Sequence, residues 1–428
     1  MKKILITVIV IFLAGILFFA QNRVNSNLSE KTEQEINDII SKNDLPINIG
    51  NISVNSISTS IKFSDVSIKE SGMNIYISDI VLNVPYKEII SILNNQNIEK
   101  IKSFDAEFKN IIINAPKEDF YNHELASNIS ISYNGVLTKE MVQNLNSRFP
   151  ETNQKIKVEL EDFKIPNQNL NEFFSELKLN PINPEVLKSD IGFTLEYIPN
   201  QRQINITNVY QKNSFGKSNF NAKLKYQGNN IENMTLSKID IDGDSDINLN
   251  NLSIGDYNSA TLMINRFSTN FQATINGNIE NMREEDIAKN IKGDYAISFN
   301  NLYLTLSDKI INEIKKDIPF ALSIPNEIAF KNMDMDVKWD GKRFQNNIDI
   351  KSTLAAIDSD IDLAINMRQP DKSRINKCTL KIGGLNNDLK ILIETLENMG
   401  GKKLPRQGND IFLNVTGSLN NPKIEGLF

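Results

Sequence analysis

Cysteine, histidine and tryptophan each occur only once in the chain, and these scarcities exclude several kinds of site. The lone Cys378 excludes a disulfide framework and any cysteine-based zinc cluster. We expect it at a half-buried strand position, because free cysteine behaves as a small hydrophobe. A catalytic triad or a Cys–His pair would need His123, which we expect in an exposed loop. No nucleophile-elbow sequence accompanies it.

Excess positive charge is also missing. The chain has 47 Lys and Arg residues against 53 Asp and Glu residues, a formal net charge of −6. The lysines are scattered, many of them beside acids, so the sequence lacks the basic face that a nucleic-acid partner requires. Neither HExxH, a P-loop nor GxGxxG occurs, and the single Trp339 leaves a sugar cleft without stacking platforms. We therefore expect no enzyme, no cofactor and no nucleic-acid partner.

The acidic run DIDGDSD (240–246) raises the question of a calcium site. An EF-hand loop starting at Asp242 would need Gly at position 247 and Glu at position 253. The chain has Ile247 and Ser253 there. The run therefore predicts a solvated turn, with a loosely held cation as the alternative.

Long apolar runs are absent except at the start, MKKILITVIVIFLAGILFFAQNR. Residues 4–20 are long enough for a short membrane-spanning helix and longer than the core of a cleaved signal peptide. The small residue expected three positions before a cut at Gln21 is missing, which favours an uncleaved signal anchor at 1–22 over a removed signal. Lys2 and Lys3 place the start in the cytoplasm and the remaining chain outside it.

The chain after the anchor predicts two mainly β regions, residues 23–190 and 191–428, both with helical additions. Strand patterns dominate from residue 45 to about 133, again from 191 to about 306, between the helical patterns at 307–318 and 384–399, and at the C-terminal end. Helical patterns cover shorter stretches, namely 29–43, 86–95, 138–148, 168–190, 307–318 and 384–399.

The strand patterns repeatedly slip by one residue. In IKFSDVSIKESGMNIYISDIVLNV (61–84), apolar residues alternate with polar ones, shift at Ser64-Asp65, resume, and shift again at Ser78-Asp79. Similar breaks occur in INIGNISV (47–54), FKNIII (108–113), INLNNLSI (247–254) and ISFNNLYL (297–304). A two-residue hairpin turn or a β-bulge would produce such a break. Ser-Asp suits a hairpin poorly, so bulges are favoured at 64–65 and 78–79. Either structure keeps the apolar residues on one face.

A sheet with one apolar face must cover that face. The ordinary solution is a closed core made with other strands and helices. The alternative is an elongated, curved antiparallel sheet whose open groove is lined by aliphatic side chains and holds an acyl chain. Under either interpretation the same residues of the first hairpins face inward, and they are our candidates for a lipid groove: Ile61, Phe63, Val66, Ile68, Ile75, Ile77, Ile80 and Leu82.

Two sequence segments, together with the N-terminal anchor, resemble those of a known protein family. ISVNSISTSIKFSDVSIKESGMNIYISDIVLNVPYKEIISIL (52–93) follows the anchor, and VTGSLNNPKIEG (415–426) lies near the end. The chain resembles the AsmA-like bacterial envelope proteins, relatives of bridge-like lipid-transfer proteins with a chorein-type N-terminus. The closing phrase places Gly417, Leu419, Asn421, Pro422 and Lys423 at the matching positions. The YdgA-like proteins, also anchored and strand-rich, have a similar outline and are the second candidate family.

The AsmA-like resemblance implies a single-pass protein of the bacterial inner membrane with its C-terminal body in the periplasm. It also implies phospholipid acyl chains as the cargo and a role in phospholipid transport or outer-membrane homeostasis. The alternative function is an anchored structural or assembly factor of the envelope, with a closed β core, no lipid cargo and other envelope proteins as partners. Metal ligands are expected in neither case.

Overall fold

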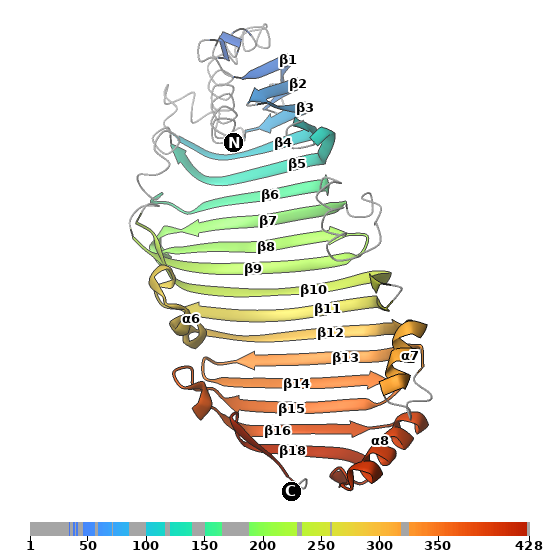
Figure 1. Cartoon of the computed structure of the whole chain (residues 1–428). Coiled ribbons are helices and arrows are strands. Elements are labelled where there is room, and N and C mark those ends of the chain that lie inside the picture. The colour runs from blue at the N-terminus through green and yellow to red at the C-terminus, as the bar shows by residue number, and fades with distance from the viewer. Residues whose placement is uncertain are drawn as a thin grey trace. The chain divides into compact units, whose positions relative to one another are not determined.

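The structure is a computed structural model (Figure 1). It describes residues 34, 37, 38, 40, 41, 46–55, 59–70, 72–84, 100–115, 120–138, 150–164, 188–228, 233–256, 259–317 and 325–425. The chain divides into two compact units. Unit 1 comprises residues 1–170, 183–214 and 223–235, and unit 2 comprises 171–182, 215–222 and 236–428.

Unit 1 is an antiparallel sheet whose strands pair in chain order from β1 to β8. Its strands are β1 (Ile47–Asn55), β2 (Ser60–Glu70), β3 (Met73–Asn83), β4 (Lys100–Ala115), β5 (Phe120–Thr138), β6 (Gln154–Phe163), β7 (Ser189–Ile198) and β8 (Gln203–Asn213). A 3-10 turn, Pro199–Gln201, connects the last two strands. The residues of β9 (Gly216–Gln227) are divided between the two units.

Unit 2 is also antiparallel, and its strands pair in chain order from β10 to β16. β16 then pairs with β18, and β17 and β19 each pair with β18. The strands are β10 (Thr235–Asp256), β11 (Ala260–Asn276), β12 (Ile291–Leu306), β13 (Glu327–Trp339), β14 (Arg343–Ser352), β15 (Ala356–Ala364), β16 (Arg374–Gly383), β17 (Arg406–Gln407), β18 (Asp410–Ser418) and β19 (Asn421–Ile424). The helices are α6 (Glu284–Asn290), α7 (Asp308–Asp317) and α8 (Asn387–Gly400), with 3-10 turns at Ile279–Asn281 and Pro370–Lys372.

The predicted mainly β, antiparallel class is confirmed, as are the helices predicted at 307–318 and 384–399. Two elements were not predicted: α6, which interrupts the strand pattern of 191–306, and β6. Ser189 and Asp190 begin β7, so the end of the helix predicted at 168–190 is wrong.

Several predicted segments fall partly or wholly outside the described residues. The five described residues of the helix predicted at 29–43 are helical. The helix predicted at 86–95, nearly all of those at 138–148 and 168–190, and the anchor at 1–22 lie outside the described residues. Within the ranges that are described, none of the helices is both long and apolar enough to cross a membrane. The two regions were predicted to meet at residues 190 and 191, whereas in the structure residues 191–214 still belong to unit 1.

Three of the predicted slips, at 64–65, 108–113 and 297–304, each contain one residue in the left-handed backbone region, whereas those at 47–54, 78–79 and 247–254 contain none. Asp65 on β2, Asn110 on β4, Asp162 on β6, Asn208 on β8 and Asn301 on β12 have φ between 50° and 55°. Asn and Asp tolerate this conformation better than other residues with a side chain. One such residue inside a strand changes which face the following side chains point to, and this is the shift seen in the sequence.

The slips at Asp65 on β2 and at Ser78 on β3 lie opposite each other in the sheet. Ser64 faces Asp79 and Val66 faces Ile77, so the pairing keeps the same register on both sides of Asp65 and Ser78. A β-bulge adds a residue to one strand only and would shift the register. The predicted bulges at 64–65 and 78–79 are therefore wrong.

The hairpin alternative fails, because each of the other four breaks lies within a single strand: β1, β4, β10 or β12. The bulge alternative is supported at one of them, since the pairing of β10 with β11 shifts register between Asn248 and Leu252. The prediction that the apolar residues stay on one face despite the slips is confirmed in the first hairpins. Ile61 and Phe63 before the slip and Val66 and Ile68 after it are all buried. The apolar side chains thus stay on one face of the sheet.

Candidate functional site: an apolar sheet face

The eight residues predicted to line a groove lie in the core at the start of unit 1. Seven of them, all except Ile75, are at most 7% exposed, and Leu82 is fully buried. Ile75 is half-buried and packs against the same cluster. Most of these residues share one hydrophobic cluster with Val84, Ala106, Ile111 and Ala126. At this end of the chain the inward residues therefore contact one another, as in a closed core.

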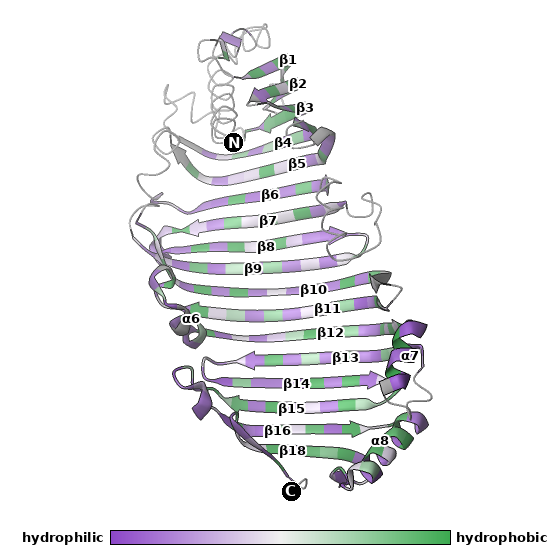
Figure 2. Cartoon of the chain, viewed as in Figure 1, coloured by the Kyte–Doolittle hydropathy of each residue, from purple (hydrophilic) through white to green (hydrophobic). Residues whose placement is uncertain are grey.

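The inward face of unit 2 is also mainly apolar, but it is covered less completely. Side chains opposite each other on antiparallel strands share a face, and the register gives three parallel rows. Figure 2 shows hydrophobic and hydrophilic residues interspersed along these strands. The first row is Phe267, Phe299, Met333, Ile350, Ile357, Ile382 and Ile411. The second row is Ile297, Met335, Ile348, Ser359, Leu380 and Leu413. The third row is Phe271, Tyr295, Val337, Asn346, Ile361 and Cys378.

These rows are only half covered. Of the first row, Ile411 is buried and all the other residues are half-buried. In the third row Tyr295 is exposed. Phe267 and Phe299 contact each other, with ring centroids 5.2 Å apart. This face of unit 2, defined by the three rows and called here the apolar face, is therefore a mainly apolar surface that the described residues leave partly accessible; its first row is apolar throughout.

A short helix closes one end of the rows. Trp339 on β13 donates a hydrogen bond from its Nε1 to the backbone oxygen of Ala288 in α6, at 2.7 Å. The indole can thus lie against apolar neighbours while its polar atom is satisfied. Near the opposite ends of the strands, α7 buries Ile311, which is 3% exposed. Ser307 caps this helix by accepting a hydrogen bond from the backbone N–H of Ile310, at 3.3 Å.

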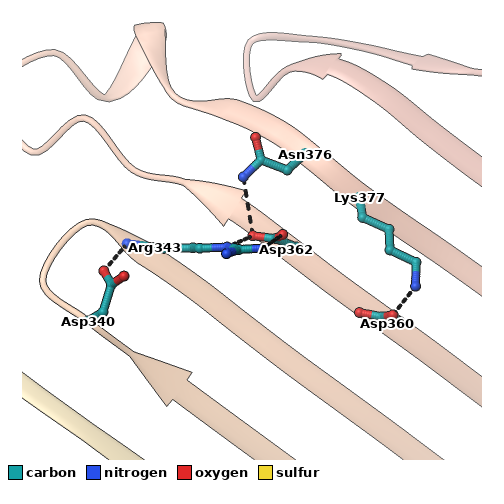
Figure 3. A network of polar contacts seen from close by, with 6 residues as sticks. All are labelled: Asp340, Arg343, Asp360, Asp362, Asn376 and Lys377. Atoms are coloured by element: carbon teal, nitrogen blue, oxygen red, sulfur yellow. Dashed lines mark hydrogen bonds and ion pairs between the residues drawn. The ribbon is translucent and has the colours of Figure 1, made fainter.

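The opposite face of the unit 2 sheet is polar and held by pairs between strands. Figure 3 shows part of it, with the side chains of Asp340, Arg343, Asp360, Asp362, Asn376 and Lys377. Arg343 on β14 donates through two nitrogens to the carboxylate of Asp362 on β15, and Asn376 on β16 donates to the same carboxylate at 3.2 Å. The hydrogen bonds from Arg343 hold the pKa of Asp362 below its usual value, despite the burial of the carboxylate. Lys377 pairs with Asp360 beside them.

A hollow of about 470 Å³ lies on this polar side and is lined by residues of β11 to β15, among them Asp294, Asp336 and Lys338. Lys338 forms an ion pair with Asp294 at 3.3 Å. Hydrogen bonds, first from Gln272 and then from Lys338, lower the pKa of Asp294. The polar side therefore has the features of a solvated surface with its charges paired across strands.

The acidic run 240–246 is not a turn but part of β10, so this prediction is wrong. Its aspartates point to the polar side and accept hydrogen bonds from neighbouring strands. Asn221 donates to Asp242 and Asn219 to Asp244, both at 2.9 Å, and Arg266 binds Asp246 with two nitrogens. Among the described residues, no three His, Cys, Asp or Glu side chains are grouped so that they could hold a metal ion.

The lone histidine and cysteine both lie on strands. His123 is on β5 and half-buried, so the predicted exposed loop is wrong; its Nε2 lies 3.0 Å from the backbone oxygen of Lys164. Cys378 is half-buried on β16, as predicted, and burial raises the pKa of its thiol. A raised pKa keeps the thiol protonated and unreactive.

Comparison with known proteins gives no family for this chain. No family model matches it, and no curated protein or solved structure is significantly similar to it. The class that the fold defines is thus a mainly β, antiparallel protein whose second unit carries a half-covered apolar face.

Proposed function

We propose that this protein is anchored in the bacterial inner membrane by residues 1–22 and holds phospholipid acyl chains in the periplasm, on the apolar face of unit 2. In this role it acts in phospholipid transport or outer-membrane homeostasis, the function that the AsmA-like resemblance implies. The observation that carries the proposal is the unbroken first row of apolar side chains across seven strands, of whose seven members only Ile411 is fully buried and the other six are half-buried.

The energetics favour an acyl chain as the occupant. Burial of apolar surface stabilises a complex by about 0.8 kcal/mol for each methylene removed from water. The first row offers only aliphatic, thioether and phenyl groups, which suit a hydrocarbon chain that needs no hydrogen bonds. Movement of lipid along such a face is partition between equivalent positions and requires no catalytic residue.

A second candidate function is the structural or assembly factor of the envelope. It is favoured by a different observation, the closed packing around Phe63, Val66 and Leu82 in unit 1. If the apolar face of unit 2 is covered in the same way in the cell, the protein carries no lipid.

Photo-crosslinking tests the proposal. The full chain in detergent is incubated with a phospholipid that carries a diazirine in its acyl chain, irradiated, and digested for peptide mass spectrometry. We expect labelled peptides from β12, β13 and β14. Because Ile348 points to the apolar face and Asn347 to the polar one, Ile348→Asp should abolish this labelling and Asn347→Asp should leave it unchanged.

Circular dichroism shows whether both variants are folded. If the wild-type chain is labelled only within residues 1–22, or Asn347→Asp loses as much labelling as Ile348→Asp, the proposal of a lipid-holding face is wrong.

A further inference from the structure

The apolar face of unit 2 contains polar side chains whose hydrogen bonds are incomplete. In the described part of the chain, four buried side-chain atoms have no hydrogen-bond partner: Oδ1 of Asn114, Oδ1 of Asn128, Oγ1 of Thr269 and Oδ1 of Asn346. Two of them lie on the apolar face, because Thr269 is opposite Ile297 of the second row and Asn346 belongs to the third row. A buried polar atom without a partner lowers the stability of a fold. On a face that is only half covered, such an atom indicates a hydrogen bond that a bound molecule completes.

Asn346 has a second polar residue beside it. Asn346 on β14 is opposite Ile361 on β15, and Ile348, the next residue of β14 on the same face, is opposite Ser359. Asn346 and Ser359 are thus diagonal neighbours on adjacent strands, with Cβ atoms about 7 Å apart. One hydroxyl group placed between these two side chains can hydrogen-bond to both.

The two side chains differ in exposure. Ser359 is 9% exposed, and its hydroxyl forms no hydrogen bond with another described residue. Asn346 is half-buried, although its Oδ1 atom is shielded from solvent. Rotation about the Cβ–Cγ bond exchanges the two ends of a side-chain amide. Asn346 can therefore present a donor or an acceptor to the open side of the face.

The surroundings of this pair restrict what can bind there. The residues opposite or beside Asn346 and Ser359 on the same face are apolar and half-buried: Val337, Ile348, Ile361 and Leu380. A plain hydrocarbon would leave the amide unpaired, and a molecule that is polar throughout would not match the apolar neighbours. A hydroxyl both donates and accepts, so it fits the Ser359 hydroxyl and either orientation of the amide, whereas an ester carbonyl only accepts. The best match is a hydrocarbon chain that carries a hydroxyl group.

We propose that the apolar face of unit 2 prefers acyl chains that carry a hydroxyl group, and that Asn346 and Ser359 bind this hydroxyl. The inference rests on the proposed function, because it names the class of acyl chain that the same face holds. Thr269 is a separate position. It lies on β11, four strands from Ser359, which at about 4.8 Å for each strand is about 19 Å, too far for both to bind one hydroxyl.

Competition in the photo-crosslinking assay tests this preference. The full chain in detergent is incubated with the diazirine phospholipid and with increasing amounts of either octadecanoic acid or 12-hydroxyoctadecanoic acid. For each acid, the concentration that halves the labelling of β12, β13 and β14 is measured. The readout is the ratio of these two concentrations. It can be compared between variants, because the partition of each acid into detergent is the same for all of them.

We expect Asn346→Leu and Ser359→Ala each to lower the preference for the hydroxy acid about five-fold, which corresponds to about 1 kcal/mol for one hydrogen bond. The matched control is Asn347→Leu, which changes an exposed residue of the same strand on the polar side. This control and Thr269→Val should leave the ratio unchanged. Asn346→Leu should also keep or raise the urea midpoint followed by Trp339 fluorescence, because it removes an unpaired polar group.

Three results would overturn the inference. One is a ratio that is the same in wild type, Asn346→Leu and Ser359→Ala, which would leave acyl binding intact but without this preference. Another is a loss of preference in Thr269→Val alone, which would place the hydroxyl on β11. The third is a lower urea midpoint for Asn346→Leu, which would mean that the amide is paired within the folded protein. If the wild-type chain takes up no label at all, the proposed function itself fails, and this inference fails with it.

Discussion

The contrast between a closed core and a half-open face can be measured with one pair of substitutions, Leu82→Ala and Leu380→Ala. Leu82 is 0% exposed in the core of unit 1, and Leu380 is half-buried on the apolar face of unit 2. Truncation to Ala removes three carbon atoms, a transfer free energy of about 2.4 kcal/mol for a fully buried side chain. The cavity left behind raises the expected loss at Leu82 to about 3–4 kcal/mol. At Leu380 solvent already shares the site, so we expect about 1 kcal/mol.

Urea unfolding of the full chain provides the assay. Trp339 is the only tryptophan and belongs to unit 2, so its fluorescence follows that unit, whereas circular dichroism follows both. Leu82→Ala should lower the transition seen by circular dichroism, and Leu380→Ala should lower the Trp339 transition only slightly. A loss at Leu380 as large as that at Leu82 would mean that the apolar face of unit 2 is sealed. The acyl-binding proposal would then lose its basis.

Three further predictions concern the backbone slip and two polar contacts. Asn110→Gly should leave the free energy of unfolding within about 0.5 kcal/mol of wild type in urea titrations, because glycine adopts positive φ freely, whereas Asn110→Val should lower it by about 2 kcal/mol. Because Arg343 lowers the pKa of Asp362 in the folded state below the ordinary value of 3.8, the stabilisation from this pair is complete above about pH 5 and is lost as pH falls through the folded-state pKa. The midpoint of Asp362→Asn followed by Trp339 fluorescence should therefore depend less on pH in this range. Trp339→Phe removes the hydrogen bond to Ala288 and should cost about 1 kcal/mol by circular dichroism; an unchanged midpoint would count against its role at the end of the apolar face.

Much of the fold could be predicted because alternation and capping are local signals. The change of parity between Phe63 and Val66 correctly indicated one continuous apolar face. It did not show whether a β-bulge or a left-handed residue causes the shift, because the pattern of a single strand cannot show whether the neighbouring strand shifts at the same place. The second slip, at Ser78-Asp79, carried that information, since a short hairpin between the strands brings it opposite Asp65.

The errors have equally local causes. The acidic run looked like a turn because four aspartates dominate it, yet Ile239, Ile241 and Ile247 occupy the odd positions that a strand requires. Helix α6 has seven residues and no side-chain cap at its start, which leaves little pattern to detect. Whether the apolar face is covered could not be predicted at all. Alternation indicates which side chains share a face but not what packs against it.

The left-handed residues on β2, β4, β6 and β8 recur once per hairpin, on every second strand of unit 1. Each hairpin therefore contains the residue that shifts its side-chain alternation, and this shift does not depend on more distant strands. Such a sheet can gain or lose whole hairpins by duplication or deletion of short gene segments without reversing the sidedness of the rest. Addition of a single strand would not carry such a residue with it. We therefore expect evolved or engineered variants of this sheet to differ in length by an even number of strands.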